Sequence, residues 1–134
     1  MIVDASVLVA AANRADPDAP RCREILRSTR GPLLVPAPAL AEASYLIQKR
    51  LGAQAEVQLI QSLLLSPWVV EGPTPEDLQR TARLMLQYVD LPLGFSDACT
   101  VAIAERRGDI KVASLDNHFR IVRPLHGATF EVLP

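Results

Sequence analysis

The chain has 134 residues, of which 49% are hydrophobic and 22% are charged, and its formal net charge is −1. This length predicts a single domain over residues 1–134, and this composition excludes a disordered chain. Because the net charge is close to zero, the composition also excludes strong nonspecific attraction to polyanions. A nucleic-acid partner would therefore need a local basic patch.

Hydropathy and cysteine usage favour a cytoplasmic protein. The opening MIVDASVLVAAAN is apolar like a signal peptide, but Asp4 interrupts it and no basic residue precedes it. No segment contains the roughly 20 apolar residues that a transmembrane helix needs. Cys22 and Cys99 have no second Cys or His at metal-ligand spacing, which argues against a zinc site. We therefore expect a soluble protein that is not exported, with both cysteines buried and reduced.

The first part of the chain predicts two helices and two short strands. A strand ends near Asp4 and a helix follows it. Asp16-Pro17-Asp18 combines an N-cap acid with a proline suited to the first helical position, and Gly31 ends the helix that begins there. Leu33-Leu34-Val35 lies between Gly-Pro and Pro and has the pattern of a buried strand.

The middle of the chain continues this alternation. A helix from residue 38 ends at Gly52, a further helix covers residues 53–65, and residues 68–70 predict a strand. Thr74-Pro75-Glu76-Asp77 then combines an N-cap, a proline and two acids, which indicates the start of another helix. The apolar stripe of the helix that begins at residue 38 consists of Leu40, Ala43, Ile47 and Leu51.

The last part of the chain predicts one more helix and further strands. Ser96 is the expected N-cap of a helix over residues 97–107, which Gly108 closes. Residues 111–115 predict a strand with Asp116 at its C-terminal end. The tail carries two short segments of β-type residues, Arg120-Ile121-Val122 and Thr129-Phe130-Glu131-Val132.

Strands that alternate with helices predict an α/β domain with a parallel sheet covered on both faces. Ligands of such sheets bind beyond the carboxyl ends of the strands. Asp4 and Asp116 are both expected at strand ends, and this is the position from which they could share a ligand.

Four acids lie where apolar segments begin or end. Asp4 is the clearest, because an acid in an apolar segment is costly to bury unless it is paired or binds a metal. Each acid also has a purely structural explanation. Asp4 or Ser6 could cap the following helix, Glu42 and Asp97 could complement a helix dipole, and Asp116 could begin an Asp-Asn turn.

Four stretches of sequence occur in order along the chain: IVDASVLVA, ALAEASYLI, DLPLGFSDACTVAIAERRG and VASLDNHF. In order and local context they resemble the PIN-domain nucleases, most closely the VapC-type toxins of bacterial toxin–antitoxin pairs. The resemblance covers essentially the whole chain. It implies a three-layer α/β/α PIN-like domain with a central, mainly parallel sheet.

The resemblance also implies the site. The acidic cluster of the family falls on Asp4, Glu42, Asp97 and Asp116, which would be the catalytic residues and would coordinate Mg²⁺ or Mn²⁺. Hard carboxylate oxygens suit these ions better than zinc or copper. Asp116 or Glu42 could also orient or deprotonate the attacking water. Three further residues are expected to support the site, namely Asp90 beside its loop, and Ser6 and Ser114 as partners of an acid or a phosphate.

Two other kinds of catalytic group are disfavoured. His118 and His126 could protonate a leaving group, but the metal chemistry does not require a histidine, and both lie in the loop-rich tail. A serine or cysteine nucleophile has no support, because the chain lacks a Gly-x-Ser-x-Gly elbow.

By the same resemblance the substrate is RNA, cut by an endoribonuclease, and the partners are a VapB-like antitoxin and a second copy of the chain. The antitoxin would place a basic side chain in the acidic pocket. The 4% aromatic content favours recognition of RNA backbone and shape over base stacking.

An alternative is a catalytically inactive PIN-like scaffold that binds RNA or protein, and a receiver or phosphatase domain fits poorly because Asp4 stands alone. Candidates for phosphate contacts at the rim are Arg14, Arg21, Arg23, Arg27, Lys49, Arg50 and Arg120, and candidates for an apolar docking face, or for the core, are Tyr45, Leu59, Leu63, Leu64 and Leu65.

Overall fold

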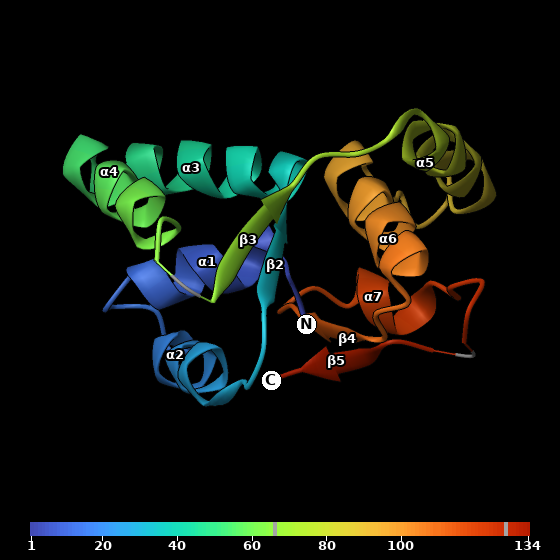
Figure 1. Cartoon of the computed structure of the whole chain (residues 1–134). Helices are drawn as coiled ribbons and strands as arrows, with labels where there is room; N and C mark the ends of the chain where they lie inside the picture. The colour runs from blue at the N-terminus through green and yellow to red at the C-terminus, as the bar shows by residue number, and fades with distance from the viewer. Residues whose placement is uncertain (66, 128) are drawn as a thin grey trace.

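A five-stranded, all-parallel sheet forms the centre of the computed structural model, which describes residues 1–65, 67–127 and 129–134. The strand order is β3-β2-β1-β4-β5, so β1 lies in the middle and pairs with both β2 and β4 (Figure 1). The expected parallel sheet is therefore confirmed. The strands are β1 (Ile2–Val3), β2 (Leu33–Pro36), β3 (Trp68–Glu71), β4 (Lys111–Ala113) and β5 (Glu131–Leu133).

Helices cover both faces of this sheet. In Figure 1 the helices of the first half of the chain lie together on one side, and those of the second half lie on the other. Contacts join α1 to α2 and α3, and α3 to α4, whereas α5 and α7 contact α6. The helices are α1 (Ala5–Ala12), α2 (Ala19–Ser28), α3 (Ala37–Leu51), α4 (Ala53–Ser62), α5 (Pro75–Gln87), α6 (Phe95–Arg107) and α7 (His118–Ile121).

The sheet divides the core into two parts because successive side chains of a strand point to opposite faces. Val3 and Ala113 pack with the apolar residues of α1, α2, α3 and α4. Their neighbours Ile2 and Val112 pack with residues of α5, α6 and α7. All four side chains are fully buried. This confirms the three-layer α/β/α arrangement.

Several predicted helix ends are confirmed by their local geometry. The Thr74 side chain accepts from the Asp77 N–H, and the Asp77 side chain accepts from the Thr74 N–H, which completes a capping box at the start of α5. Gly52 follows α3. Gly108 ends α6 in the left-handed conformation, with φ of 69°, which glycine adopts without steric cost.

The structure corrects three predictions. Ser96 is not the N-cap of α6, because the helix begins at Phe95 with Gly94 as its cap, and Ser96 lies in the first turn. The segment Arg120-Ile121 is helical rather than extended, because it belongs to α7, which follows the turn at Asp116. The predicted strand over residues 111–115 ends at Ala113.

Two smaller shifts concern helix lengths. α2 begins at Ala19, so that its early proline is Pro20 rather than Pro17, and Asp16 accepts a hydrogen bond from the Asp18 N–H in the preceding turn. α4 ends at Ser62 rather than near residue 65.

The apolar residues near α4 are only partly buried. Leu59 is buried and Leu63 packs against the core, whereas Leu64 is 81% exposed and Leu65 is 67% exposed. Tyr45 on α3 is also exposed. Both cysteines are free and buried, as expected. None of the helices within the described residues has the length and hydrophobicity needed to span a bilayer.

Candidate active site

The candidate site lies beside β1, where the order in which the chain adds strands to the sheet changes direction. The chain runs outward from β1 through β2 to β3, and then returns to place β4 on the other side of β1. Crevices at the carboxyl ends of strands beside such a reversal are the usual ligand sites of parallel sheets. Asp4 directly follows β1, and Asp116 lies three residues beyond β4. The topology therefore brings these two acids to the same edge.

A pocket of about 320 Å³ opens at this edge, and all four predicted acids line it. Asp4 comes from the end of β1 and Asp116 from the loop after β4. Glu42 comes from the second turn of α3, and Asp97 from the first turn of α6. The pocket is lined by Asp4, Ala5, Ser6, Val9, Ala10, Asp16, Glu42, Leu46, Arg50, Asp97, Leu115 and Asp116.

Asp4 is buried and is held by two serines. Its Oδ2 accepts hydrogen bonds from the Ser6 hydroxyl at 2.6 Å, from the Ser6 N–H at 3.3 Å and from the Ser114 hydroxyl at 2.9 Å. Asp4 therefore caps α1, as its structural explanation anticipated, and lines the pocket as well. Asp4 can cap α1 and also bind a ligand. The hydrogen bonds that the described residues donate to its side chain all end on Oδ2, so they leave Oδ1 for a ligand.

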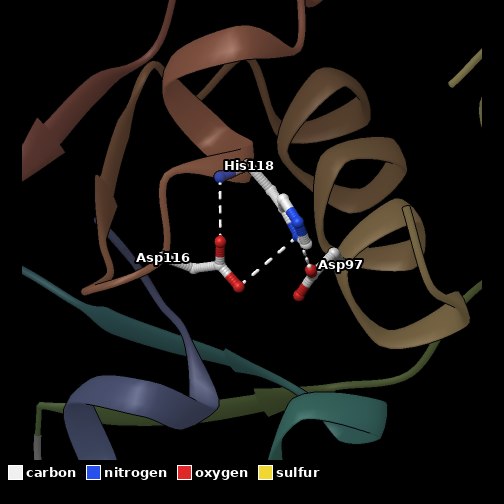
Figure 2. A group of neighbouring side chains, drawn as sticks. All are labelled: Asp97, Asp116 and His118. Atoms are coloured by element: carbon white, nitrogen blue, oxygen red, sulfur yellow. Dashed lines mark hydrogen bonds and ion pairs between the residues drawn. The ribbon is translucent and has the colours of Figure 1, made fainter. Parts of the chain in front are cut away.

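Asp97, Asp116 and His118 form a compact group (Figure 2). The His118 Nδ1 lies 2.8 Å from the Asp97 Oδ2 and 3.4 Å from the Asp116 Oδ2. The His118 backbone N–H donates to the Asp116 Oδ1 at 2.9 Å. One ligand atom from each of the three side chains falls within 4.8 Å of the others, which is close enough for a single ion.

The electrostatics of the pocket favour a bound cation. The pKa of the Asp97 carboxyl is raised to about 6, chiefly because burial disfavours the charged form. The hydrogen bond from His118 lowers this pKa, whereas the nearby Asp4 and Asp116 carboxylates raise it further. The hydrogen bond to Asp97 raises the pKa of His118 in turn. Five acids and one arginine line the pocket. A divalent cation would offset this repulsion, and carboxylate oxygens are the ligands that Mg²⁺ and Mn²⁺ prefer.

The predicted supporting residues divide into two groups. Ser6 and Ser114 lie at the site and hold Asp4, and the Ser114 hydroxyl also accepts from the Asp116 N–H at 2.9 Å. Asp90 is exposed in the loop after α5 and does not line the pocket. His126 is exposed as well, and its Nε2 lies 2.8 Å from the Asp109 carbonyl oxygen rather than near the acids.

Sequence reasoning missed three residues of the site or gave them too little weight. His118 was disfavoured because the tail seemed loop-rich, although its position two residues after Asp116 was a usable signal. Asp16 was interpreted only as a helix start, yet it lines the pocket. Arg50 was one of seven basic candidates, and the structure places it in the pocket wall. Its spacing of eight residues from Glu42 puts both on one face of α3.

Comparison with known proteins identifies the family of the chain. Residues 1–124 match the model of the PIN domain. The chain is 32% identical to Ribonuclease VapC26 of Mycobacterium tuberculosis over 135 aligned residues that cover all of both proteins.

Two solved structures have similar folds. One is Mycobacterium tuberculosis VapC20, described as a Sarcin-Ricin loop cleaving toxin, with a TM-score of 0.86 and 20% identity over 95% of this chain and 98% of that one. The other is FitAcB from Neisseria gonorrhoeae, with a TM-score of 0.64 and 16% identity over 87% of each chain. At these identities the two structures establish similarity of fold.

Proposed function

This chain belongs to the PIN-domain family, and from that membership we propose that it is a metal-dependent endoribonuclease, the toxin of a type II toxin–antitoxin pair. The observation that carries the proposal is the convergence of Asp4, Glu42, Asp97 and Asp116 on one pocket from four distant places in the sequence. The full-length similarity to a VapC ribonuclease supports the same activity. We place this activity in the cytoplasm.

The four acids are the proposed ligands of Mg²⁺ or Mn²⁺. Asp97 and Asp116 offer carboxylate oxygens within 4.8 Å of each other and would hold the ion directly, while Asp4 and Glu42 line the pocket from the β1 and α3 sides. A divalent cation at such a site lowers the pKa of bound water and neutralises charge on a phosphodiester.

The residues of the chain divide the remaining work. Ser6 and Ser114 fix the buried Asp4, so its carboxylate is oriented before a ligand arrives. Glu42 is exposed on α3 and receives no hydrogen bond from the described residues, so its carboxylate oxygens are the ones best able to accept a proton from the attacking water. Arg50, at the same wall, would pair with a phosphate of the RNA.

The proposed protein partner is a cognate antitoxin related to VapB. The exposed Tyr45, Leu64 and Leu65 give it apolar surface to cover, and the acidic pocket would accept a basic side chain. A homodimer is the further expectation, and size-exclusion chromatography with light scattering, with and without the antitoxin, tests both.

Cleavage of total RNA by the purified protein tests the proposed activity. Wild-type protein should cut RNA with Mg²⁺ or Mn²⁺ and lose activity with a chelator. Asp97→Asn and Glu42→Gln should lose activity while keeping the wild-type circular dichroism spectrum. Glu24→Gln, a matched charge change on the exposed side of α2, should cut as wild type does.

If the folded Asp97→Asn protein cuts RNA at the wild-type rate, the site is wrong. If wild-type protein binds RNA with no cleavage under any of these conditions, the chain is an inactive PIN-like scaffold instead.

A further inference from the structure

His118 contacts two acids of the candidate cation site, Asp97 and Asp116. Its ring nitrogen Nδ1 is 2.8 Å from the Asp97 Oδ2 and 3.4 Å from the Asp116 Oδ2, and its backbone N–H donates to the Asp116 Oδ1 at 2.9 Å (Figure 2). One residue therefore touches a carboxylate from α6 and a carboxylate from the loop after β4.

The backbone under His118 is fixed by the core. His118 begins α7, and the next residue, Phe119, is fully buried with its ring edge-to-face against Phe130 at 6.3 Å between centroids. Val122 is also fully buried, and its N–H donates to the His118 carbonyl at 3.0 Å. The imidazole thus projects from an anchored turn, and its side chain is only 26% exposed.

The two carboxylates need such an anchor. The Asp116 side chain is 37% exposed in a loop, and the Asp97 carboxylate lies beside acids of the same charge. Without a common donor, repulsion would turn the two groups apart and leave their orientation to be fixed when the ion binds. Partners that hold metal-binding carboxylates raise affinity for the metal by removing this cost.

We propose that His118 is a positioning residue that holds the Asp97 and Asp116 carboxylates so that both face one divalent cation. The inference rests on the proposed cation site. The Nδ1 that faces the acids is at hydrogen-bond distance from Asp97, so His118 acts through the carboxylates and is not itself a ligand. The hard ions that suit this pocket also prefer oxygen to nitrogen.

Mn²⁺ binding to the RNA-free protein, measured by electron paramagnetic resonance, tests this role without requiring cleavage. His118→Ala should weaken Mn²⁺ binding roughly tenfold, the lower end of the range for such partners. His118→Asn should retain most of the affinity, because its amide nitrogen takes the place of Nδ1. His126→Ala, which removes the other histidine, should bind as wild type does because its ring lies away from the acids. The concentration of Mg²⁺ for half-maximal RNA cleavage should rise with His118→Ala, and kcat at saturating Mg²⁺ should recover.

Several outcomes would overturn the inference. These are wild-type Mn²⁺ affinity in folded His118→Ala, an Asn variant no better than the Ala variant, or nitrogen hyperfine coupling from His118 to the bound Mn²⁺, which would make the residue a ligand. If wild-type protein binds Mn²⁺ and cuts RNA but His118→Ala matches it, only this inference fails. If wild-type protein neither binds Mn²⁺ nor cuts RNA, the proposed function fails as well.

Discussion

The Ser114 hydroxyl donates a hydrogen bond of 2.9 Å to the Asp4 carboxylate and so joins the ends of β1 and β4 across 110 residues of sequence. The same oxygen accepts from the Asp116 N–H at 2.9 Å. One buried side chain therefore sets the position of an acid on each of the two neighbouring strand ends. Asp4 and Asp116 are coupled through Ser114 before any cation binds.

Replacement of Ser114 by alanine should therefore disturb both acids. The change removes a donor from the buried Asp4 carboxylate and leaves the Asp116 N–H without its partner, so the free energy of unfolding should fall by about 1–3 kcal/mol. Urea unfolding in the presence of a chelator measures this loss. Ser28→Ala, at the exposed end of α2, is the matched control and should lose less than about 0.5 kcal/mol. Equal stabilities of the two variants would contradict the role assigned to Ser114.

Asp97→Asn should stabilise the metal-free protein at neutral and higher pH. The carboxyl has a pKa of about 6 in the folded protein against its usual 3.8, so the folded state binds more protons between these values. The stability that protonation of the folded Asp97 carboxyl contributes is fully present below about pH 4 and is lost as the pH rises through about 6. The corresponding free energy is at most about 3 kcal/mol.

Thermal unfolding in the presence of a chelator, at pH 5 and pH 8, measures this effect. The variant should unfold at a higher temperature than wild type at pH 8, and the difference should shrink at pH 5, where the wild-type carboxyl is protonated. Saturating Mn²⁺ should reverse the order, because the cation stabilises only the protein that binds it. A variant less stable than wild type at pH 8 without metal would contradict the raised pKa of Asp97 that burial and the neighbouring acids produce.

The features of the fold that could be predicted from sequence are those set by local signals. Thr74-Pro75-Glu76-Asp77 starts a helix because the cap and its partner lie three residues apart. Ser96 was assigned as a cap by the same logic, but it lies inside α6 because the helix starts at Phe95, one residue after Gly94. A serine near a helix start does not by itself reveal which backbone carbonyl begins the helical hydrogen bonds.

The acids of the site were predictable, and their supporting contacts were less so. Asp4 interrupts an apolar segment, which marks it in the sequence alone. The contact between His118 and Asp97 joins residues 21 apart through a four-residue helix, and a segment this short has no periodicity to detect. Arg120-Ile121-Val122 looked like a strand for the same reason. His118 was disfavoured as a proton donor because the tail was expected to be rich in loops, whereas the structure places it at the start of α7.

Arg106 should stabilise the fold without affecting the pocket. Its Nε donates to both oxygens of the buried Asp77, at 3.1 and 2.9 Å, and its Nη1 donates to Glu71 at 2.8 Å, which ties α6 to α5 and β3. Arg106→Met keeps most of the side-chain bulk but leaves the Asp77 carboxylate with fewer donors, so the free energy of unfolding, measured by urea unfolding, should fall by about 1–3 kcal/mol.

Arg107→Met is the control for Arg106→Met. Its longer ion pair to Glu71, at 3.6 Å, lies at a more exposed position and should contribute about 0.5 kcal/mol or less. Loss of Mn²⁺ binding by folded Arg106→Met would contradict this separation of stability from the site.

Arg50 should bind a phosphate of the RNA. It is the positively charged side chain among the residues that line the pocket, it lies on the face of α3 that carries Glu42 and Leu46, and within the described residues it forms no ion pair. An unpaired guanidinium beside the proposed cation ligands can hold the phosphate next to the one that is cut, because its donors match phosphate oxygens.

Substitution of Arg50 by glutamine should weaken RNA binding more than it slows the chemical step. Binding is measured by fluorescence anisotropy on the Asp97→Asn background with Mg²⁺, where RNA stays intact. The affinity should fall about three- to tenfold, and the slope of log affinity against log salt should become shallower by about 0.7, as expected when one phosphate contact on a single strand is lost. In the active protein KM should rise while kcat changes little. Arg83→Gln removes the same charge from an exposed position on α5 and should leave both the affinity and the slope unchanged, since Arg83 does not line the pocket. An equal effect of the two substitutions would mean that Arg50 acts only through the net charge of the protein.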